Sequence, residues 1–199
     1  MTFLVDLAAM VLAMPRVLFP AIGATALGGG ATTVGLLTAG IALGTMAASL
    51  LSGPLGAVRR QGLAVLVSVA GWAVAITVFG LIVVAAPGPA PGGGAHPLLW
   101  AAVAVLLLAG AADAVSSVFR MTILQAATPD ALRGRLQGVF IVVVAGGPQL
   151  GQLVLGATAQ LTGEAVAAVA GGLACLVVLA ALARHQPTFA HYDARDPTP

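Results

Sequence analysis

The chain has 199 residues, of which 60% are hydrophobic and 7% are charged, and its formal net charge is +2. A soluble domain carries about 25% charged residues, so this composition excludes a water-soluble globular protein and predicts an all-α integral membrane protein. All eight basic residues are arginines, and their small excess gives no reason to expect a nucleic-acid partner. The single cysteine and three scattered histidines have no metal-ligand spacing, so neither a metal nor a cofactor is expected.

Six apolar stretches have the length of about 20 residues that a helix needs to cross a bilayer. They cover residues 3–26, 32–51, 63–85, 98–119, 136–159 and 165–182. The transmembrane bundle is therefore expected over residues 1–183, and the polar residues 184–199 are expected to form a mobile cytoplasmic tail. A secretory signal peptide is the competing interpretation of the first stretch, because Ala24-Thr25-Ala26 resembles a cleavage site. A charge and two prolines inside the stretch argue against it.

The second stretch has small residues at every fourth position. They are Gly40, Gly44, Ala48 and Ser52. Such a face lets another helix approach closely. Leu43-Gly44 in this stretch is echoed by Leu150-Gly151 in the fifth, as expected if the first and last three spans are inverted repeats.

The longest polar passage in the middle of the chain, residues 120–138, is expected to be a cytoplasmic hinge. Thr128, Pro129 and Asp130 in it have the pattern of a helix start, with an N-cap, a proline at the first helical position and an acid at the positive end of the dipole. Five loop arginines lie on the same side of the membrane as the tail: Arg59, Arg60, Arg120, Arg133 and Arg135. The positive-inside rule places them, and both termini, in the cytoplasm.

Charged residues inside the first and fourth stretches are candidates for function, because charge at membrane depth is costly. Arg16 lies near the middle of the first, between Pro15 and Pro20, where a broken helix would free backbone carbonyls. It is expected to line a substrate path, with an interfacial or structural role as the alternative. Asp6 is expected to pair with a loop arginine. Asp113 is a candidate proton site or partner for an arginine on another helix.

The spacing within the fourth stretch also bears on Asp113. Arg120 shares its helix face two turns away, which is too far for a direct bond unless the helix bends.

The fifth stretch carries glutamines on one helical face. Gln149, Gln152 and Gln160 follow Pro148, which is expected to kink the helix. Amides facing lipid would be unsatisfied, so these residues are expected either to bond other helices or to line a cavity. No phosphate-binding loop, metalloprotease or serine-hydrolase motif is present, so an enzyme is not expected.

Two segments resemble a known family. Residues 14–21, MPRVLFPA, are similar to the seventh helix of the enterobactin exporter family, within the major facilitator superfamily. Residues 123–138, ILQAATPDALRGRLQG, are similar to that family's turn between helices ten and eleven. The resemblance implies that residues 1–183 form the carboxy-terminal six-helix bundle of a twelve-helix exporter of the bacterial inner membrane.

This resemblance implies proton-coupled antiport of drugs, siderophores or other small molecules. Arg16, Gln149 and Gln152 would line the substrate path and Asp113 would couple protons. The lipid bilayer and an amino-terminal half absent from this chain would be its partners. One departure from the superfamily pattern is that Ala57 or Val58 stands where an acid is expected in the loop before the third span. The alternative is a non-transporting subunit, scaffold or inactive fragment that assembles through the small-residue face of the second span.

Overall fold

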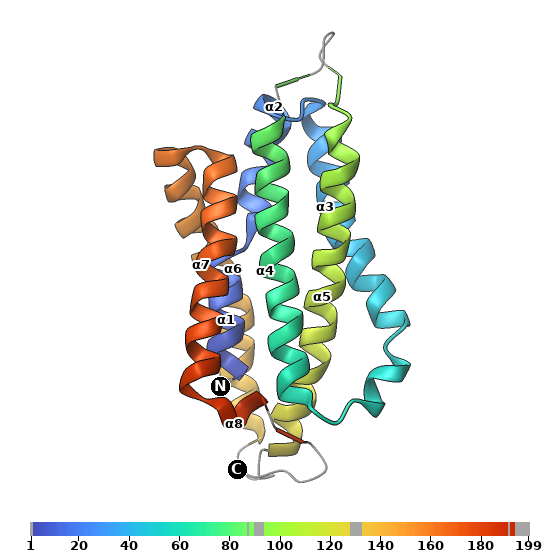
Figure 1. Ribbon diagram of the computed structural model, residues 1–199, viewed down its shortest axis with the longest axis vertical. Coiled ribbons are helices and arrows are strands. Elements are labelled where there is room, and N and C mark those ends of the chain that lie inside the picture. The colour runs from blue at the N-terminus through green and yellow to red at the C-terminus, as the bar shows by residue number, and fades with distance from the viewer. Residues whose placement is uncertain (1, 87, 90–93, 128–132, 191, 194–199) are drawn as a thin grey trace.

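The computed structural model describes residues 2–86, 88–89, 94–127, 133–190 and 192–193. Within these ranges the chain is helical apart from its turns and one isolated backbone bridge between Arg60 and Asp193. Figure 1 shows the long helices running along a common axis, with both termini at the lower end. Six helical segments of the described chain are long and apolar enough to cross a membrane. The fold is therefore the six-helix transmembrane bundle that the sequence predicts.

The first span is broken, as its two prolines predict. Helix α1 (Thr2–Leu12) ends before Met14, which is extended, and is followed by the 3-10 helix η1 (Pro15–Leu18) and by α2 (Phe19–Thr25). Trp72 stabilises the break, because its indole Nε1 donates a hydrogen bond of 3.0 Å to the carbonyl of Ala13. Leu18 and Phe19 are buried in the core, which fits a bundle helix better than a signal peptide.

The remaining spans are single helices. These are α3 (Gly30–Leu50), α4 (Gln61–Ala85), α5 (Leu98–Ala127), α6 (Arg133–Thr162) and α7 (Glu164–His185), and the short 3-10 helix η2 (Gly53–Ala57) follows α3. Helix α5 packs along α3 and α4, while α1 packs against α6 and α7. The bundle thus consists of two three-helix groups, α3–α4–α5 and α1–α6–α7, and the extensive contact between α4 and α7 joins them.

Each of the two groups contains a close helix contact at a glycine, and the two contacts correspond. A Cβ at Gly44 of α3 would collide with the carbonyl oxygen of Leu107 on α5, and a Cβ at Gly151 of α6 would collide with that of Met10 on α1. The first contact joins the second and fourth spans, and the other joins the fifth and first. In a repeat of three spans, the second span corresponds to the fifth and the first to the fourth, so the two contacts are equivalent. This correspondence fits the inverted repeat, with Gly44 and Gly151 at the positions of the sequence echo.

The small-residue face of α3 is occupied within the chain. Gly40 and Gly44 are buried, and a Cβ at Gly40 would lie 2.9 Å from the carbonyl oxygen of Val103 on α5. Ser52 lies beyond the end of α3. The suggestion that this face assembles the chain with a partner is therefore wrong for Gly40 and Gly44, because α5 of the same chain already covers them.

The polar passage after the fourth span is shorter than predicted. Helix α5 continues to Ala127 and α6 begins at Arg133, so Arg120 lies within a helix and not in a loop. The expectation that Arg120 lies in a loop is therefore wrong, because its charge is paired with Asp6 of α1 inside the bundle, as described below. The predicted helix start at Thr128, Pro129 and Asp130 lies outside the described residues. Helix α6 runs on through Pro148, and the kink there stays a prediction.

The first part of the predicted tail is docked on the bundle. Helix α7 extends to His185, and the short helix α8 (Pro187–Ala190) follows. Phe189 and Tyr192 pack against the apolar core, and Gly62 at the start of α4 lies so close to the backbone of Phe189 that a Cβ would have no room. The expectation of a free tail from residue 184 onward is wrong for these residues, since two aromatic side chains bury apolar surface there.

Candidate functional site

Three charged residues inside the bundle form a cluster. Arg120 of α5 donates a hydrogen bond from Nη1 to Oδ1 of Asp6 on α1, and both side chains are almost fully buried, at 6% and 2% exposure. The second guanidinium nitrogen, Nη2, lies 3.7 Å from Oδ1 of Asp113 on the same helix. We call Asp6, Arg120 and Asp113 the charge cluster. It carries two carboxylates and one guanidinium when all three are ionised.

The charge cluster corrects the location of one expected partner and agrees with a second expectation. Asp6 does pair with an arginine, although that arginine is buried in a helix and not in a loop. Nη2 of Arg120 and Oδ1 of Asp113 lie within ion-pair distance, but at 3.7 Å they are too far apart for the direct bond that two helical turns were expected to prevent. A guanidinium at the end of its long side chain reaches along the helix surface toward the N-terminal turn, which is the direction in which helical side chains point.

The bonding of the buried pair is incomplete. Among the described residues, neither Oδ2 of Asp6 nor Nε of Arg120 has a hydrogen-bond partner, although both atoms are buried. A buried ion pair offsets the cost of its desolvation only when the remaining lone pairs and protons are also satisfied. The desolvation of Asp6 and Arg120 is therefore only partly offset, which is unfavourable for a contact that serves stability alone.

Two recesses meet at Asp113, whose side chain is 51% exposed. An open recess of about 470 Å³ lies between α3 and the lower part of α5, and Thr45, Ser49 and Ser117 line it together with Asp113. A smaller recess of about 40 Å³ lies between α1, α4 and α5. It is lined by Asp6, Ala9, Met10, Met14, Trp72 and Asp113. Asp113 therefore stands between an open hydroxyl-lined space and the interior of the bundle.

Arg16 lies in η1, at the break of the first span, and its side chain is exposed. Its carbonyl accepts the backbone N–H of Phe19, so the 3-10 turn satisfies one group that the break releases. The guanidinium acts electrostatically on Asp113. The structure therefore relates two of the predicted site residues, Arg16 and Asp113, although they lie far apart in the sequence.

The predicted path glutamines lie on α6. Gly147 and Gly151 of this helix face Met10 of α1. Gln149, two residues from each, points to the opposite side and is exposed, whereas Gln152 is half-buried. Among the described contacts, no hydrogen bond satisfies either amide, and none joins them to Arg16 or Asp113. The polar side of α6 is thus open in this chain.

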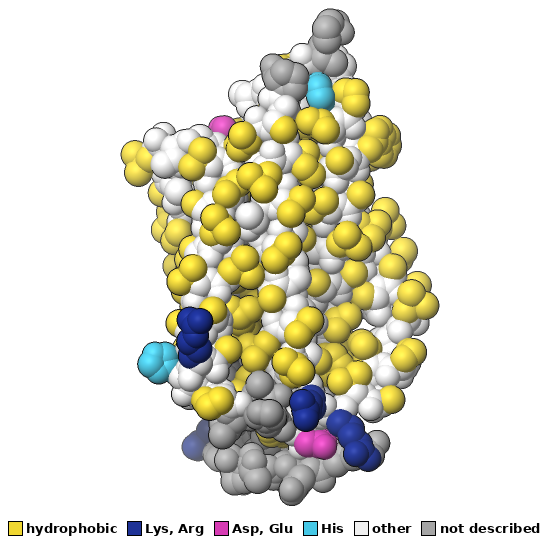
Figure 2. Space-filling model, in the orientation of Figure 1, with side chains coloured by type: hydrophobic (Ala, Val, Ile, Leu, Met, Phe, Trp, Pro, Cys, Tyr) yellow, Lys and Arg dark blue, Asp and Glu magenta, His cyan; other side chains and the backbone are white. Residues whose placement is uncertain are grey.

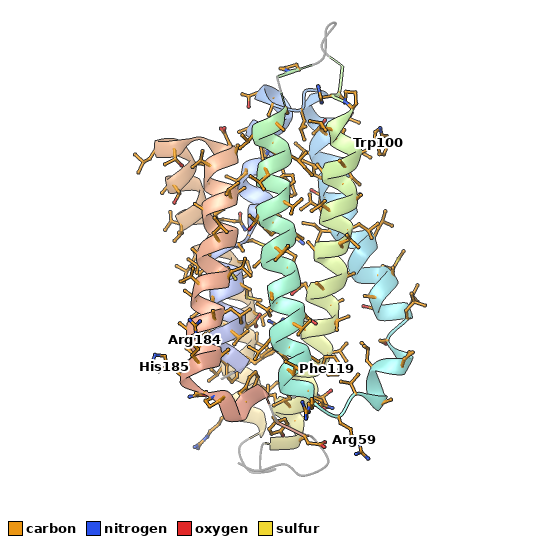
Figure 3. All side chains as sticks on the ribbon, viewed as in Figure 1. Arg59, Trp100, Phe119, Arg184 and His185 are labelled. Carbon is orange, nitrogen blue, oxygen red and sulfur yellow. The ribbon has the colours of Figure 1, made fainter. Side chains whose placement is uncertain are left out.

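The other arginines lie near the lower end of the bundle. Arg59 and Arg60 are exposed in the turn before α4, and Arg135 is exposed in the first turn of α6. Arg133 begins α6, and its side chain is outside the described part of the chain. Figure 2 shows basic side chains only over the lower part of the face in view. Figure 3 shows Trp100 at the opposite end of the bundle from Arg59 and Arg184.

The comparison with known proteins defines the class of this membrane protein. The chain is a homologue of transporters of the major facilitator superfamily, which are not enzymes. The particular relatives are enterobactin exporters named EntS. The protein from Citrobacter koseri is 36% identical over 176 residues, covering 85% of this chain and 39% of that relative. The proteins from Salmonella paratyphi A and Escherichia coli O1:K1 are each 34% identical, over 90% and 91% of this chain and 41% and 42% of theirs.

The homology covers only part of the length of the relatives. The chain spans about two fifths of the length of the curated relatives that it matches. No protein-family model matches the chain, and no solved structure matches it significantly. The chain is thus a multi-pass membrane protein that is homologous to part of a bacterial exporter, and its six-helix bundle is consistent with one half of a major facilitator fold.

Proposed function

We propose that this chain is the carboxy-terminal half of a secondary active exporter of siderophores, drugs or other small molecules in a bacterial inner membrane. The observation that carries the proposal is a set of polar side chains that are exposed at membrane depth. Arg16, Asp113 and Gln149 are exposed there although lipid cannot solvate a charge or an amide. Water in a path or a second bundle would solvate these groups.

The length of the relatives supports a path between two bundles. Each enterobactin exporter is more than twice as long as the region it shares with this chain. Alternating access in such transporters takes place between two bundles that move about a central site. We assign Arg16, Gln149 and Gln152 to the substrate path and Asp113 to proton coupling, with an amino-terminal bundle as the partner.

The orientation follows from the arginines. Arg59, Arg60 and Arg135 lie toward the end that carries both termini, and the amphipathic ring of Trp100 lies toward the other. By the positive-inside rule the arginine-rich end is cytoplasmic. This orientation supports a gating or anchoring role at the inner surface for Arg59, Arg60, Arg133 and Arg135, whereas Arg120 is buried inside the bundle.

An efflux assay tests the proposal. The amino-terminal half of the Escherichia coli relative would be joined to residues 1–199 and expressed in cells that lack their own exporter. We expect proton-gradient-dependent export of enterobactin above the empty-vector level. Arg16→Ala should reduce it at least tenfold, whereas the control Arg184→Ala, at the exposed end of α7, should not. Unchanged efflux by Arg16→Ala at normal membrane levels would remove Arg16 from the path.

A further inference from the structure

We infer that Asp6 is a second proton-binding site and that Arg120 is a latch, which pairs with Asp6 when Asp6 is ionised and with Asp113 when Asp6 is protonated. The inference deepens the proposed transporter function, because it gives the bundle a proton-dependent movement. It rests on the geometry of the charge cluster, on its unsatisfied atoms and on the helices that it connects.

The stoichiometry of the charge cluster favours one bound proton. Two carboxylates share one guanidinium, so the ionised cluster has a net charge of −1, and two of its three groups, Asp6 and Arg120, are almost fully buried. One proton on either carboxylate makes the cluster neutral, and the arginine then has a single anionic partner. Burying an unbalanced charge is costly, and a group in that situation takes up a proton instead.

The unsatisfied atoms show where the proton can go. Oδ2 of Asp6 is buried without a partner, while Oδ1 is held by Arg120. A proton on Asp6 weakens its attraction for Nη1. Asp113 already lies 3.7 Å from Nη2, so a small rotation of the guanidinium brings it to the second carboxylate. The guanidinium itself keeps its protons throughout, because arginine does not deprotonate in proteins.

A route for the proton is present in the two recesses. The space beside Asp6 holds about 40 Å³, and Asp113 lines both this space and the open recess of about 470 Å³. A cavity of roughly 10–15 Å³ on this measure accommodates a water molecule when polar groups line it. Water between Asp113 and Asp6 would therefore pass a proton from the open recess to the buried carboxyl.

The position of the latch explains what its opening would do. Asp6 belongs to the α1–α6–α7 group and Arg120 to the α3–α4–α5 group. The two groups are packed along α4 and α7, and α1 and α5 do not pack extensively on each other. The ion pair is thus a tie between the groups, away from the α4–α7 contact. Transfer of Arg120 to Asp113, on its own helix, releases this tie.

The other charged groups of the neighbouring helices lie at helix ends. Within Gln61–Ala85, α4 has no acidic or basic residue. In α7 such residues are confined to Glu164 at one end and Arg184 and His185 at the other, and in α6 to the first turn. Arg16 acts on Asp113.

Distance measurements between α1 and α5 test the latch. Nitroxides would replace Leu4 and Thr122, two exposed residues beside the cluster, in the chain with Cys175→Ala, reconstituted in lipid nanodiscs. Pulsed electron paramagnetic resonance should give a short distance at high pH and a shift of several ångströms to longer distances at low pH. Asp6→Asn, which imitates the protonated acid, should give the long distance at every pH, and Asp113→Asn should abolish the shift.

A control and a second measurement complete the test. Glu164→Gln removes a carboxyl at the end of α7 and should leave the pH response unchanged. Infrared difference spectra should contain the carbonyl band of a protonated carboxyl that Asp6→Asn removes and that Asp6→Glu, which keeps an acid, retains at a shifted frequency. A pH-independent distance in the unmodified cluster, or a band and shift that survive Asp6→Asn, would overturn the inference. Neither readout requires transport, so it can fail while the efflux assay succeeds.

Discussion

Trp72 of α4 donates a hydrogen bond of 3.0 Å from its indole nitrogen to the carbonyl of Ala13, at the point where the first span is broken. The donor and acceptor are 59 residues apart in the sequence. Both residues are buried, so water does not replace this bond. The break that exposes Arg16 therefore depends on a side chain from another helix.

The first prediction concerns this bond. Trp72→Phe should leave the carbonyl of Ala13 buried without a donor, and such a loss costs about 1–3 kcal/mol. We expect a lower thermal unfolding midpoint in detergent micelles. Trp100→Phe is the matched control, because Trp100 is an exposed tryptophan at the end of α5 and its loss should leave the midpoint unchanged. Equal midpoints for both variants would show that the break does not need Trp72.

The second prediction concerns the paired glycines of the repeat. Gly44→Ala and Gly151→Ala should each destabilise the bundle by about 1–3 kcal/mol, because the new Cβ would meet a backbone carbonyl that cannot move freely. Gly35→Ala and Gly146→Ala change the same helices at positions where a Cβ meets nothing within 4 Å. They should be neutral in the same unfolding measurement. A loss of similar size at all four positions would contradict the proposed close contacts.

The third prediction concerns the pair of Asp6 and Arg120. Arg120→Gln leaves the carboxylate of Asp6 buried without a cation and should cost about 3–5 kcal/mol. Asp6→Asn leaves Arg120 with Asp113 as its remaining partner and should cost less. The double variant Asp6→Asn with Arg120→Gln should lose less than the sum of the single losses, since no buried charge is then left alone. Asp113→Asn should cost less than Asp6→Asn, because its carboxylate is half-exposed and lies farther from the guanidinium. Additive losses in a double-mutant cycle would show that the two residues do not act together.

Much of the fold could be predicted because it follows from local pattern. Hydropathy locates the six spans, the prolines at positions 15 and 20 predict the break, and four-residue spacing predicts close packing at Gly40 and Gly44. The end of the fourth span was misjudged because Arg120 lowers the local hydropathy and resembles a loop residue. Its partner on α1 neutralises it inside the helix, and a partner 114 residues away leaves no local signal.

The site was predictable only as a set of residue types. Ionisable groups at membrane depth single out Arg16, Asp6 and Asp113, and the structure adds which of them meet. The role of Trp72 had no signal beyond a tryptophan in an apolar stretch. The docking of Phe189 and Tyr192 was missed because the polar residues around them dominate the composition of the tail. The function of Gln149 and Gln152 remains a proposal that concerns surfaces open in this chain.

Water access to the polar side of α6 tests the central claim most directly. Single cysteines would be placed at Gln149, at Gln152 and, as a control, at Val177, an exposed apolar residue near the middle of α7. The chimaeric exporter with Cys175→Ala would be treated in native membranes with a hydrophilic maleimide. If the glutamines line a substrate path, both cysteines will react at least tenfold faster than the cysteine at Val177, and excess enterobactin will slow them. Equal, slow reaction at all three positions would mean that this side of α6 faces lipid and would contradict the proposed path.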